Sequence, residues 1–258
     1  MIAASEKEKI LFSQLCIDDM ETYFETDAKG IGIYNEKSLH RILKRFLCDD
    51  VSCFEQRVGR YIADIFDRER IIEVQSGSFY PLKEKLKYYL EETPYAVTVV
   101  HPVIADKTII NADKESGEIK SMRRSPKRES HWDVLPEMFW LKDIIPSDKL
   151  TVRLVFVSAK EYRYSERVRF RRSGAYDSSL VPEGIVGSME LSQIKDYYDY
   201  IPTQLRGDKG FSSSEYSSVS KLKGRKLSLA LSFLCSVGLL KKEKQGKRWI
   251  YFCEMQSK

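Results

Sequence analysis

Apolar residues recur at helical spacing along the first fifty positions of the chain, and the pattern then changes to the shorter period of strands. A polar stretch, Asp67–Arg70, interrupts the strand-like part and predicts the turn of a hairpin. The expected elements, in order, are helices over 5–25 and 36–48, a strand hairpin over 57–75 and an amphipathic helix over 81–92.

The middle of the chain contains two strongly apolar segments. Residues 95–104 are nearly all apolar and are bounded by turn signals, which is typical of a strand buried on both faces. The pattern then predicts a hairpin over 107–124, a helix around 133–145 and a second apolar strand over 150–164. This order of elements predicts a mixed α/β sheet with helices packed on it.

A change in composition marks the last quarter. Residues 173–187, "SGAYDSSLVPEGIVG", have the composition of a linker. Beyond it we expect helices over 189–202, 212–222 and 224–238, followed by two strands around the turn "QGKR". Three helices and a two-stranded ribbon resemble a winged helix-turn-helix domain. The expected organisation is a first domain over 1–172, a linker over 173–187 and a winged helix-turn-helix over 188–258.

Bulk composition indicates an ordinary globular protein, because 42% of its 258 residues are hydrophobic and 31% are charged. No apolar run approaches the roughly 20 residues of a membrane span, so no membrane partner is expected. The start of the chain is charged early, and no signal peptide is expected. The five cysteines are scattered and contain no CxxC pair, which predicts reduced thiols and a cytoplasmic location.

The net charge is only +5, but the cations are segregated. They gather in three segments, 120–128, 163–172 and 221–248. Segregated basic patches favour a polyanionic partner, nucleic acid first. Candidate nucleic-acid-binding residues are Arg123, Arg124, Lys127 and Arg128 in the first segment, and Lys223, Arg225, Lys226, Lys247 and Arg248 in the last. Winged helices also serve as protein-interaction modules, so that alternative stays open for the last group.

The hairpin over 57–75 carries carboxylates in otherwise apolar surroundings. A two- or four-residue loop within Asp67–Arg70 places Asp64 opposite Glu73, whereas a three-residue loop would shift this register. Like charges about 5 Å apart destabilise a sheet unless a cation or a shared proton lies between them. A divalent ion bound by Asp64, Glu73, the Val74 carbonyl and water fits best. The alternative is an exposed hairpin whose acids face solvent or pair with Arg57 or Arg60.

The same residues resemble the core of the PD-(D/E)xK nuclease superfamily. "YIADI", then "IIEVQ", then a lysine-rich helix match that core in order over 36–100. The resemblance implies a restriction-endonuclease-like sheet and a magnesium or manganese ion bound by Asp64 and Glu73. It also implies that Gln75 stands at the position of the motif lysine, where it would orient the attacking water.

Gln75 departs from the motif because an amide carries no positive charge. In relatives, a lysine of the next helix can take over this role, which the resemblance assigns to Lys83, or to Lys85 or Lys87. Glu55, nine residues before Asp64, resembles the additional upstream acid of resolvase-like members.

The sequence thus predicts a magnesium-dependent DNA endonuclease with a separate winged-helix reader, in a restriction or defence role. The alternative is a non-catalytic DNA-binding regulator built on a decayed nuclease fold, which Gln75 favours. RNA also stays open as a substrate. Cleavage of both strands needs two active sites, so a homodimer is expected.

Overall fold

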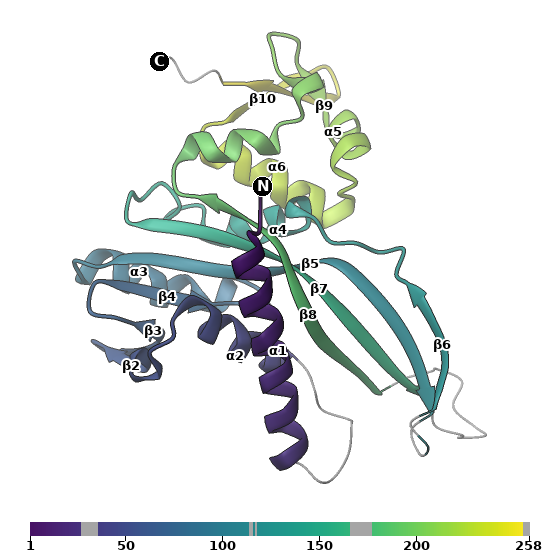
Figure 1. The fold of residues 1–258 in the computed structure, drawn as a ribbon. Helices are drawn as coiled ribbons and strands as arrows, with labels where there is room; N and C mark the ends of the chain where they lie inside the picture. Colours follow the sequence, from purple (N-terminus) through teal and green to yellow (C-terminus); the bar gives the residue numbers. More distant parts are fainter. Residues whose placement is uncertain (27–35, 114–115, 117, 166–176, 255–258) are drawn as a thin grey trace. The chain divides into compact units, whose positions relative to one another are not determined.

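The computed structural model describes residues 1–26, 36–113, 116, 118–165 and 177–254. Most strands form one large mixed sheet flanked by helices (Figure 1), and three short strands form a second sheet. The strand order of the large sheet is β1-β8-β7-β5-β4-β3-β2, and β6 pairs with β5. The mixed α/β architecture predicted from the sequence is therefore confirmed.

The chain divides into two compact units, each assembled from three stretches of sequence. The first unit consists of Met1–Gln56, Pro102–Glu129 and Val155–Met189, and the second of Arg57–His101, Ser130–Leu154 and Glu190–Lys258. The long strands β5 (Ala96–Asp113), β7 (Leu150–Ser165) and β8 (Asp177–Leu191) continue from one unit into the other. This division differs from the domain boundaries expected from the sequence, because the stretches of both units alternate along the chain.

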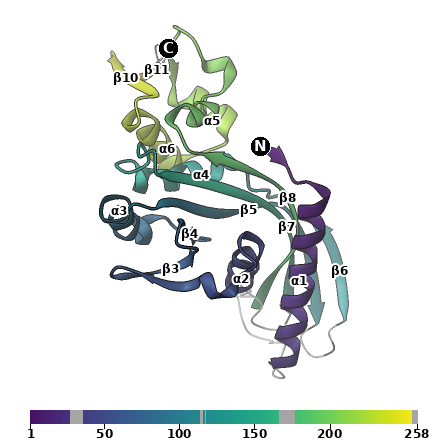
Figure 2. The ribbon, with the colours of Figure 1, turned by 60° about the vertical axis from the view of Figure 1, so that its left-hand side comes forward.

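The first unit begins with the two helices that the apolar stripes predict, α1 (Glu6–Thr26) and α2 (Glu36–Leu47). Their contact is apolar: Phe12 and Ile42 are fully buried, and the Phe12 and Phe46 rings meet edge to face with centroids 5.4 Å apart. Helix α1 lies along β8 (Figure 2). The other elements of this unit are β1 (Ile2–Ala3), η1 (Val51–Cys53), the start of β2 (Phe54–Val58) and β6 (Ile119–Arg124).

The predicted linker over 173–187 is wrong. Strand β8 begins at Asp177, and residues 173–176 lie outside the described residues. The glycines that suggest a linker have another use, since Gly187 lets β1 approach closely: a Cβ there would lie 2.4 Å from the Ile2 carbonyl oxygen. Gly187 therefore reflects the packing of two strands.

The second unit contains the predicted hairpin as β3 (Tyr61–Phe66) and β4 (Arg70–Val74). Helix α3 (Lys83–Glu92), preceded by η2 (Tyr80–Leu82), connects β4 to β5. β4 and β5 pair in parallel, as a strand–helix–strand crossover requires. The predicted buried strand and the following hairpin arm form one long strand, β5, whose Val99 and Val100 are fully buried.

The remainder of the second unit packs α4 (His131–Met138) against α6 (Gly224–Ser236) (Figure 1). The first helix expected here, over 189–202, is wrong in part: β8 ends at Leu191, and only a 3₁₀ helix, η4, follows. Strand β9, which pairs with β11, is not predicted by the sequence pattern. The remaining bounds are η3 (Phe139–Leu141), η4 (Ile194–Tyr200), η5 (Thr203–Leu205), β9 (Phe211–Ser212), α5 (Ser213–Ser220), β10 (Leu240–Gln245) and β11 (Arg248–Cys253).

Within the described residues, no helix combines the length and the apolar character that crossing a membrane requires.

Candidate active site

The β3–β4 hairpin sets the register of the two acids. Ile65 pairs with Ile72 and Phe66 with Ile71, so the next residues along, Asp64 and Glu73, lie opposite each other. This is the register predicted for an even-numbered loop.

The turn is fixed by a side chain of its own. Asp67 Oδ1 accepts hydrogen bonds from the amides of Glu69 (3.1 Å) and Arg70 (2.9 Å). Arg68 adopts the positive φ of +70° that a two-residue hairpin loop needs. The Asp67 hydrogen bonds and the Arg68 conformation thus fix this hairpin turn, and with it the register of the carboxylates, without the Asn-Gly sequence that favours such turns.

Asp64 is oriented by the neighbouring strand. Its Oδ2 accepts a hydrogen bond of 2.8 Å from the amide of Val74. A backbone donor aimed at a carboxylate favours the charged form. Asp64 is half-buried, so it is also the member of the pair that is more open to solvent.

Glu73 is buried, with 2% of its surface exposed. Its Oε2 accepts a hydrogen bond of 2.6 Å from Lys85 Nζ, and its Oε1 has no hydrogen-bond partner among the described residues. Burial raises the pKa of Glu73 to about 7, against the opposing effect of the Lys85 charge, and Asp64 adds to the increase. Glu73 therefore holds a proton more tightly than an ordinary glutamate does.

Helix α3 presents Lys85 and Tyr89 one turn apart, on the face toward the hairpin. Tyr89 is fully buried, and its hydroxyl has no hydrogen-bond partner in the described part of the chain. Burial first, and then the Glu73 charge, raise the pKa of Tyr89, so the phenol stays protonated and can donate. Among the described residues, the site therefore combines a buried acceptor, Glu73 Oε1, with a buried donor, the Tyr89 hydroxyl, on which the Glu73 carboxylate acts.

Within the described residues, no hydrogen bond joins the Gln75 side chain to Asp64 or Glu73. Its Nε2 donates to the Ser78 carbonyl at 2.8 Å, which closes the loop after β4. His101, which sequence reasoning missed, lies with Nδ1 2.6 Å from the Gln75 carbonyl oxygen. A histidine inside an otherwise apolar strand was the available signal. The role expected for Gln75, orienting an attacking water, stays a prediction.

The helix lysine at the site is Lys85 and not Lys83. Lys83 Nζ lies 3.1 Å from Asp143 Oδ2, which engages it away from Glu73. Glu55 belongs to the first unit, where it pairs with Lys44 of α2, whereas Asp64 and Glu73 belong to the second. Of the lysines that the resemblance offers, Lys85 is thus the one that contacts Glu73, and the roles expected for Lys83 and Glu55 stay predictions.

The alternative of solvent-facing acids paired with arginine is wrong for Glu73. Arg57 Nε donates to the Gly59 carbonyl at 3.2 Å. The guanidinium of Arg60 lies over the rings of Tyr61 (5.2 Å) and Tyr88 (4.7 Å). The two arginines are thus engaged by a backbone carbonyl and by aromatic rings.

Asp64 and Glu73 supply some of the oxygen ligands that a hard divalent cation needs, but not all of them. Two carboxylates face each other, and Glu73 Oε1 is a buried acceptor that needs a positive partner. Among the described residues, no group of three or more His, Cys, Asp or Glu side chains gathers at one point. The Val74 carbonyl and water would therefore have to complete the coordination, as the sequence predicts.

A scan against family models matches residues 37–192 to the family described as "Domain of unknown function (DUF8091)". The chain belongs to this family. A relative from Treponema pallidum (strain Nichols), described as "Uncharacterized protein", is 28% identical over 156 residues, which are 58% of this chain and 61% of that protein. The chain therefore matches about three fifths of the relative's length. No solved structure matches the chain.

The DUF8091 region includes the hairpin, α3 and the first basic segment. Within that segment Arg124 donates two hydrogen bonds to Asp106, at 3.0 and 2.5 Å, and these bonds are the main cause that lowers the pKa of Asp106. Arg123, Lys127 and Arg128 are exposed. Of the second segment, residues 166–172 lie outside the described residues. Arg124 is thus engaged by a carboxylate, which weakens its expected role in phosphate binding.

The DUF8091 region ends before the last basic segment. Lys223, Arg225 and Lys226 are exposed at the start of α6, at the end where sequence reasoning expects them. Lys247 and Arg248 are exposed at the turn of the β10–β11 ribbon. The cations needed for an interaction with a polyanion are therefore present on this part of the second unit.

Proposed function

We propose that this protein is a magnesium-dependent DNA endonuclease whose active site contains Asp64, Glu73 and Lys85. One observation carries the proposal: the buried carboxylate of Glu73 lies opposite Asp64, contacts the Lys85 ammonium through one oxygen and leaves the other oxygen without a partner among the described residues. Opposed carboxylates beside a lysine are the groups that metal-dependent phosphodiester hydrolysis uses.

Each residue has a specific task in this proposal. Asp64 and Glu73 would hold Mg²⁺ or Mn²⁺, with the Val74 carbonyl and water as further ligands. Such an ion, when bound, polarises a phosphodiester and lowers the pKa of an attacking water. Lys85 would place positive charge where negative charge develops on the phosphate, which Gln75 cannot do. Tyr89 would donate its hydroxyl hydrogen within the same buried site.

The C-terminal elements support a DNA-reading role. The order of η4, β9, α5, α6 and the β10–β11 ribbon is typical of a winged helix-turn-helix domain. In such domains the N-terminal end of the third helix enters a major groove. The exposed cations Lys223, Arg225 and Lys226 at the start of α6 fit this use. DNA is the proposed partner, and a homodimer would supply the second active site for cleavage of both strands.

Cleavage of supercoiled plasmid in Mg²⁺ or Mn²⁺ tests the proposal. Asp64→Asn and Glu73→Gln should abolish cleavage while DNA affinity is retained. Lys85→Met should reduce the rate by about 100-fold or more, as the loss of a group that stabilises developing charge does. Lys83→Met is the matched control, because Lys83 lies on the same helix but contacts Asp143. Equal cleavage by wild type and Glu73→Gln would refute the assignment. A labelled RNA strand tested in parallel distinguishes the substrates.

The ion pair between Lys85 and Glu73 favours a second function, the non-catalytic DNA-binding regulator. In this pair the Lys85 ammonium supplies the positive charge that the Glu73 carboxylate needs, so no metal ion is required there. Calorimetric titration with Mg²⁺ and Mn²⁺ separates the two functions. Binding that disappears in Asp64→Ala supports the nuclease. Absence of binding in both proteins, with DNA affinity retained and no DNA-dependent metal uptake, supports the regulator.

A further inference from the structure

The β10–β11 ribbon carries an exposed aromatic side chain that the proposed function does not use. Trp249 has 50% of its surface exposed, which is unusual for the largest apolar side chain. Its directly opposite neighbour in the ribbon is Lys244, and Lys242 Nζ lies 5.2 Å from the centre of its ring. The indole thus lies on a ribbon face between two lysines.

Charge on the two faces of the ribbon differs. Cross-strand pairing puts Lys242, Lys244 and Trp249 on one face, because side chains alternate along each strand. The ribbon's acid, Glu243, lies on the other face, where it pairs with Lys241 at 2.9 Å. In the described part of the chain, no carboxylate pairs with the lysines beside Trp249. This face therefore carries an exposed aromatic ring, and its charged side chains are all cationic.

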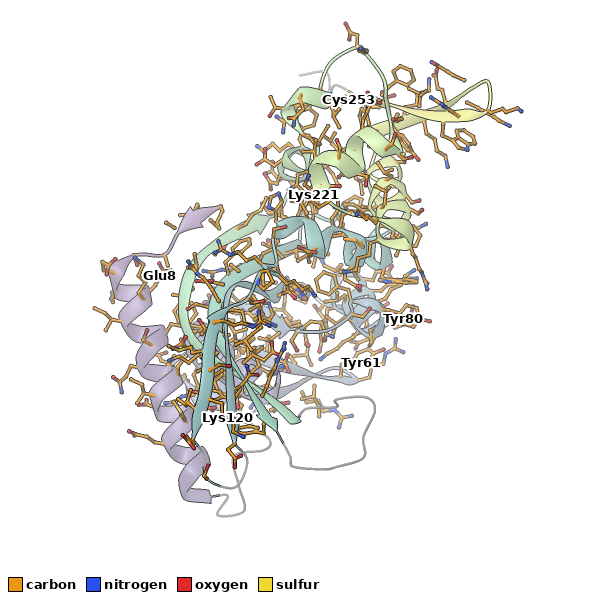
Figure 3. All side chains as sticks on the ribbon, turned by 90° about the vertical axis from the view of Figure 1, so that its right-hand side faces the viewer. Glu8, Tyr61, Tyr80, Lys120, Lys221 and Cys253 are labelled. Carbon is orange, nitrogen blue, oxygen red and sulfur yellow. The ribbon has the colours of Figure 1, made fainter. Side chains whose placement is uncertain are left out.

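The base of the ribbon is anchored, so the tryptophan is held in a defined position. Tyr251, two residues from Trp249, pairs with Phe211 of β9, and their rings stack with centroids 6.0 Å apart. Figure 3 shows the ribbon extending outward from Cys253, at the end of β11. An aromatic ring on a supported strand loses little conformational entropy when a planar ligand stacks on it.

We infer that the Trp249 face binds an unpaired nucleobase, with Lys242 and Lys244 contacting the adjoining phosphates. The inference rests on the proposed DNA binding and narrows its substrate class to DNA with a single-stranded end or junction. Within a duplex the neighbouring pairs cover both ring faces of a base, so an interior base can stack on a protein side chain only after it leaves the duplex, whereas lysine–phosphate contacts are available on any strand. The exposed cations of α6 would then hold the adjacent duplex.

Tryptophan and lysine together also suit an anionic membrane surface, but the ribbon favours nucleic acid. Membrane insertion of an amphipathic surface needs several large apolar side chains exposed together. In the ribbon, whose residues are all described, Trp249 is the one exposed large apolar side chain; Ile250 and Tyr251 are half-buried. A single ring between lysines matches a stacked base better than a lipid layer.

Fluorescence anisotropy with the full chain in EDTA tests this inference without cleavage. The ligands are a blunt duplex and the same duplex with a short single-stranded overhang. Wild type should bind the overhang form on the order of 10-fold more tightly, the usual effect of one stacked base. Trp249→Ala should remove this preference and leave blunt-duplex affinity nearly unchanged, and Trp249→Phe should keep most of it.

The controls separate the possible failures. Lys241→Gln, on the opposite face of the ribbon, should leave the overhang preference intact, and thermal unfolding should show that Trp249→Ala is folded. No overhang preference in wild type, or an equal loss for both ligands in Trp249→Ala, would overturn the inference while leaving the proposed function standing. Trp249-dependent binding to phosphatidylserine vesicles without any overhang preference would also overturn it. Failure to bind either duplex would instead reject the proposed DNA binding itself.

Discussion

The buried carboxyl of Glu73 should make the stability of the protein depend on pH. Its pKa rises from 4.5 to about 7 on folding, mainly because burial penalises the charged form. A pKa difference of about 2.5 corresponds to about 3 kcal/mol, at about 1.4 kcal/mol for each pKa unit. The native state holds this proton more tightly than the unfolded chain, so the associated stability is fully present below pH 4.5 and is lost as pH rises through 7.

Glu73→Gln removes the titrating group and keeps the size of the side chain. We expect the free energy of unfolding of wild type, relative to this variant, to fall by about 3 kcal/mol between pH 4.5 and pH 8. Urea unfolding followed by tryptophan fluorescence measures both proteins across that range. If the site binds Mg²⁺, adding it above pH 7 should restore part of the wild-type stability, because the ion replaces the proton as the partner of the carboxylate.

Glu69→Gln is the matched control, since it makes the same chemical change on an exposed side chain of the same hairpin. Its pH profile should follow that of wild type. If wild type and Glu73→Gln showed parallel profiles between pH 4.5 and pH 8, Glu73 would have an ordinary pKa, and the reasoning from burial would be refuted.

Two further predictions test other parts of the molecule. Gly187→Ala should lower the free energy of unfolding by about 1–3 kcal/mol, because the new methyl group would meet the Ile2 carbonyl oxygen. Thermal unfolding measures this change against the control Gly184→Ala on the same strand, where the atom nearest to a new Cβ is the Ser158 hydroxyl oxygen at 3.3 Å, which can move with its side chain. Unchanged unfolding relative to that control would contradict the packing of β1. Charge reversal at Lys223 and Arg225 should weaken DNA binding and reduce its salt dependence; binding unchanged at every salt concentration would assign this surface to protein partners.

Local patterns in the sequence predict the hairpin well. The carboxylate register follows from the loop length, since a period of two fixes which residues face each other. The supporting turn, in which Asp67 bonds two amides, gave no obvious sequence signal beyond a polar stretch. The strand register was therefore predictable from the sequence, whereas the Asp67 hydrogen bonds that stabilise the turn were seen only in the structure.

Tertiary packing decided what the sequence could not. Three lysines of α3 were candidates for the site, and only the orientation of the helix against the sheet selects Lys85 over Lys83. Gly187 of β8 looked like part of a linker because a close approach of two backbones and a flexible segment both favour glycine. Gln75 was assigned from its place in a motif, but its side chain bonds the Ser78 carbonyl.

Each unit is built from three separated stretches of chain, with β5, β7 and β8 running through both. No single cut in the chain can release either unit intact, so neither unit can be produced by truncation or by limited proteolysis at one bond. The core of each unit also forms only when segments that are distant in the sequence come together, and such non-local contacts slow folding. The two units should accordingly gain and lose structure in a single cooperative transition, with local damage in one lowering the melting temperature of the other.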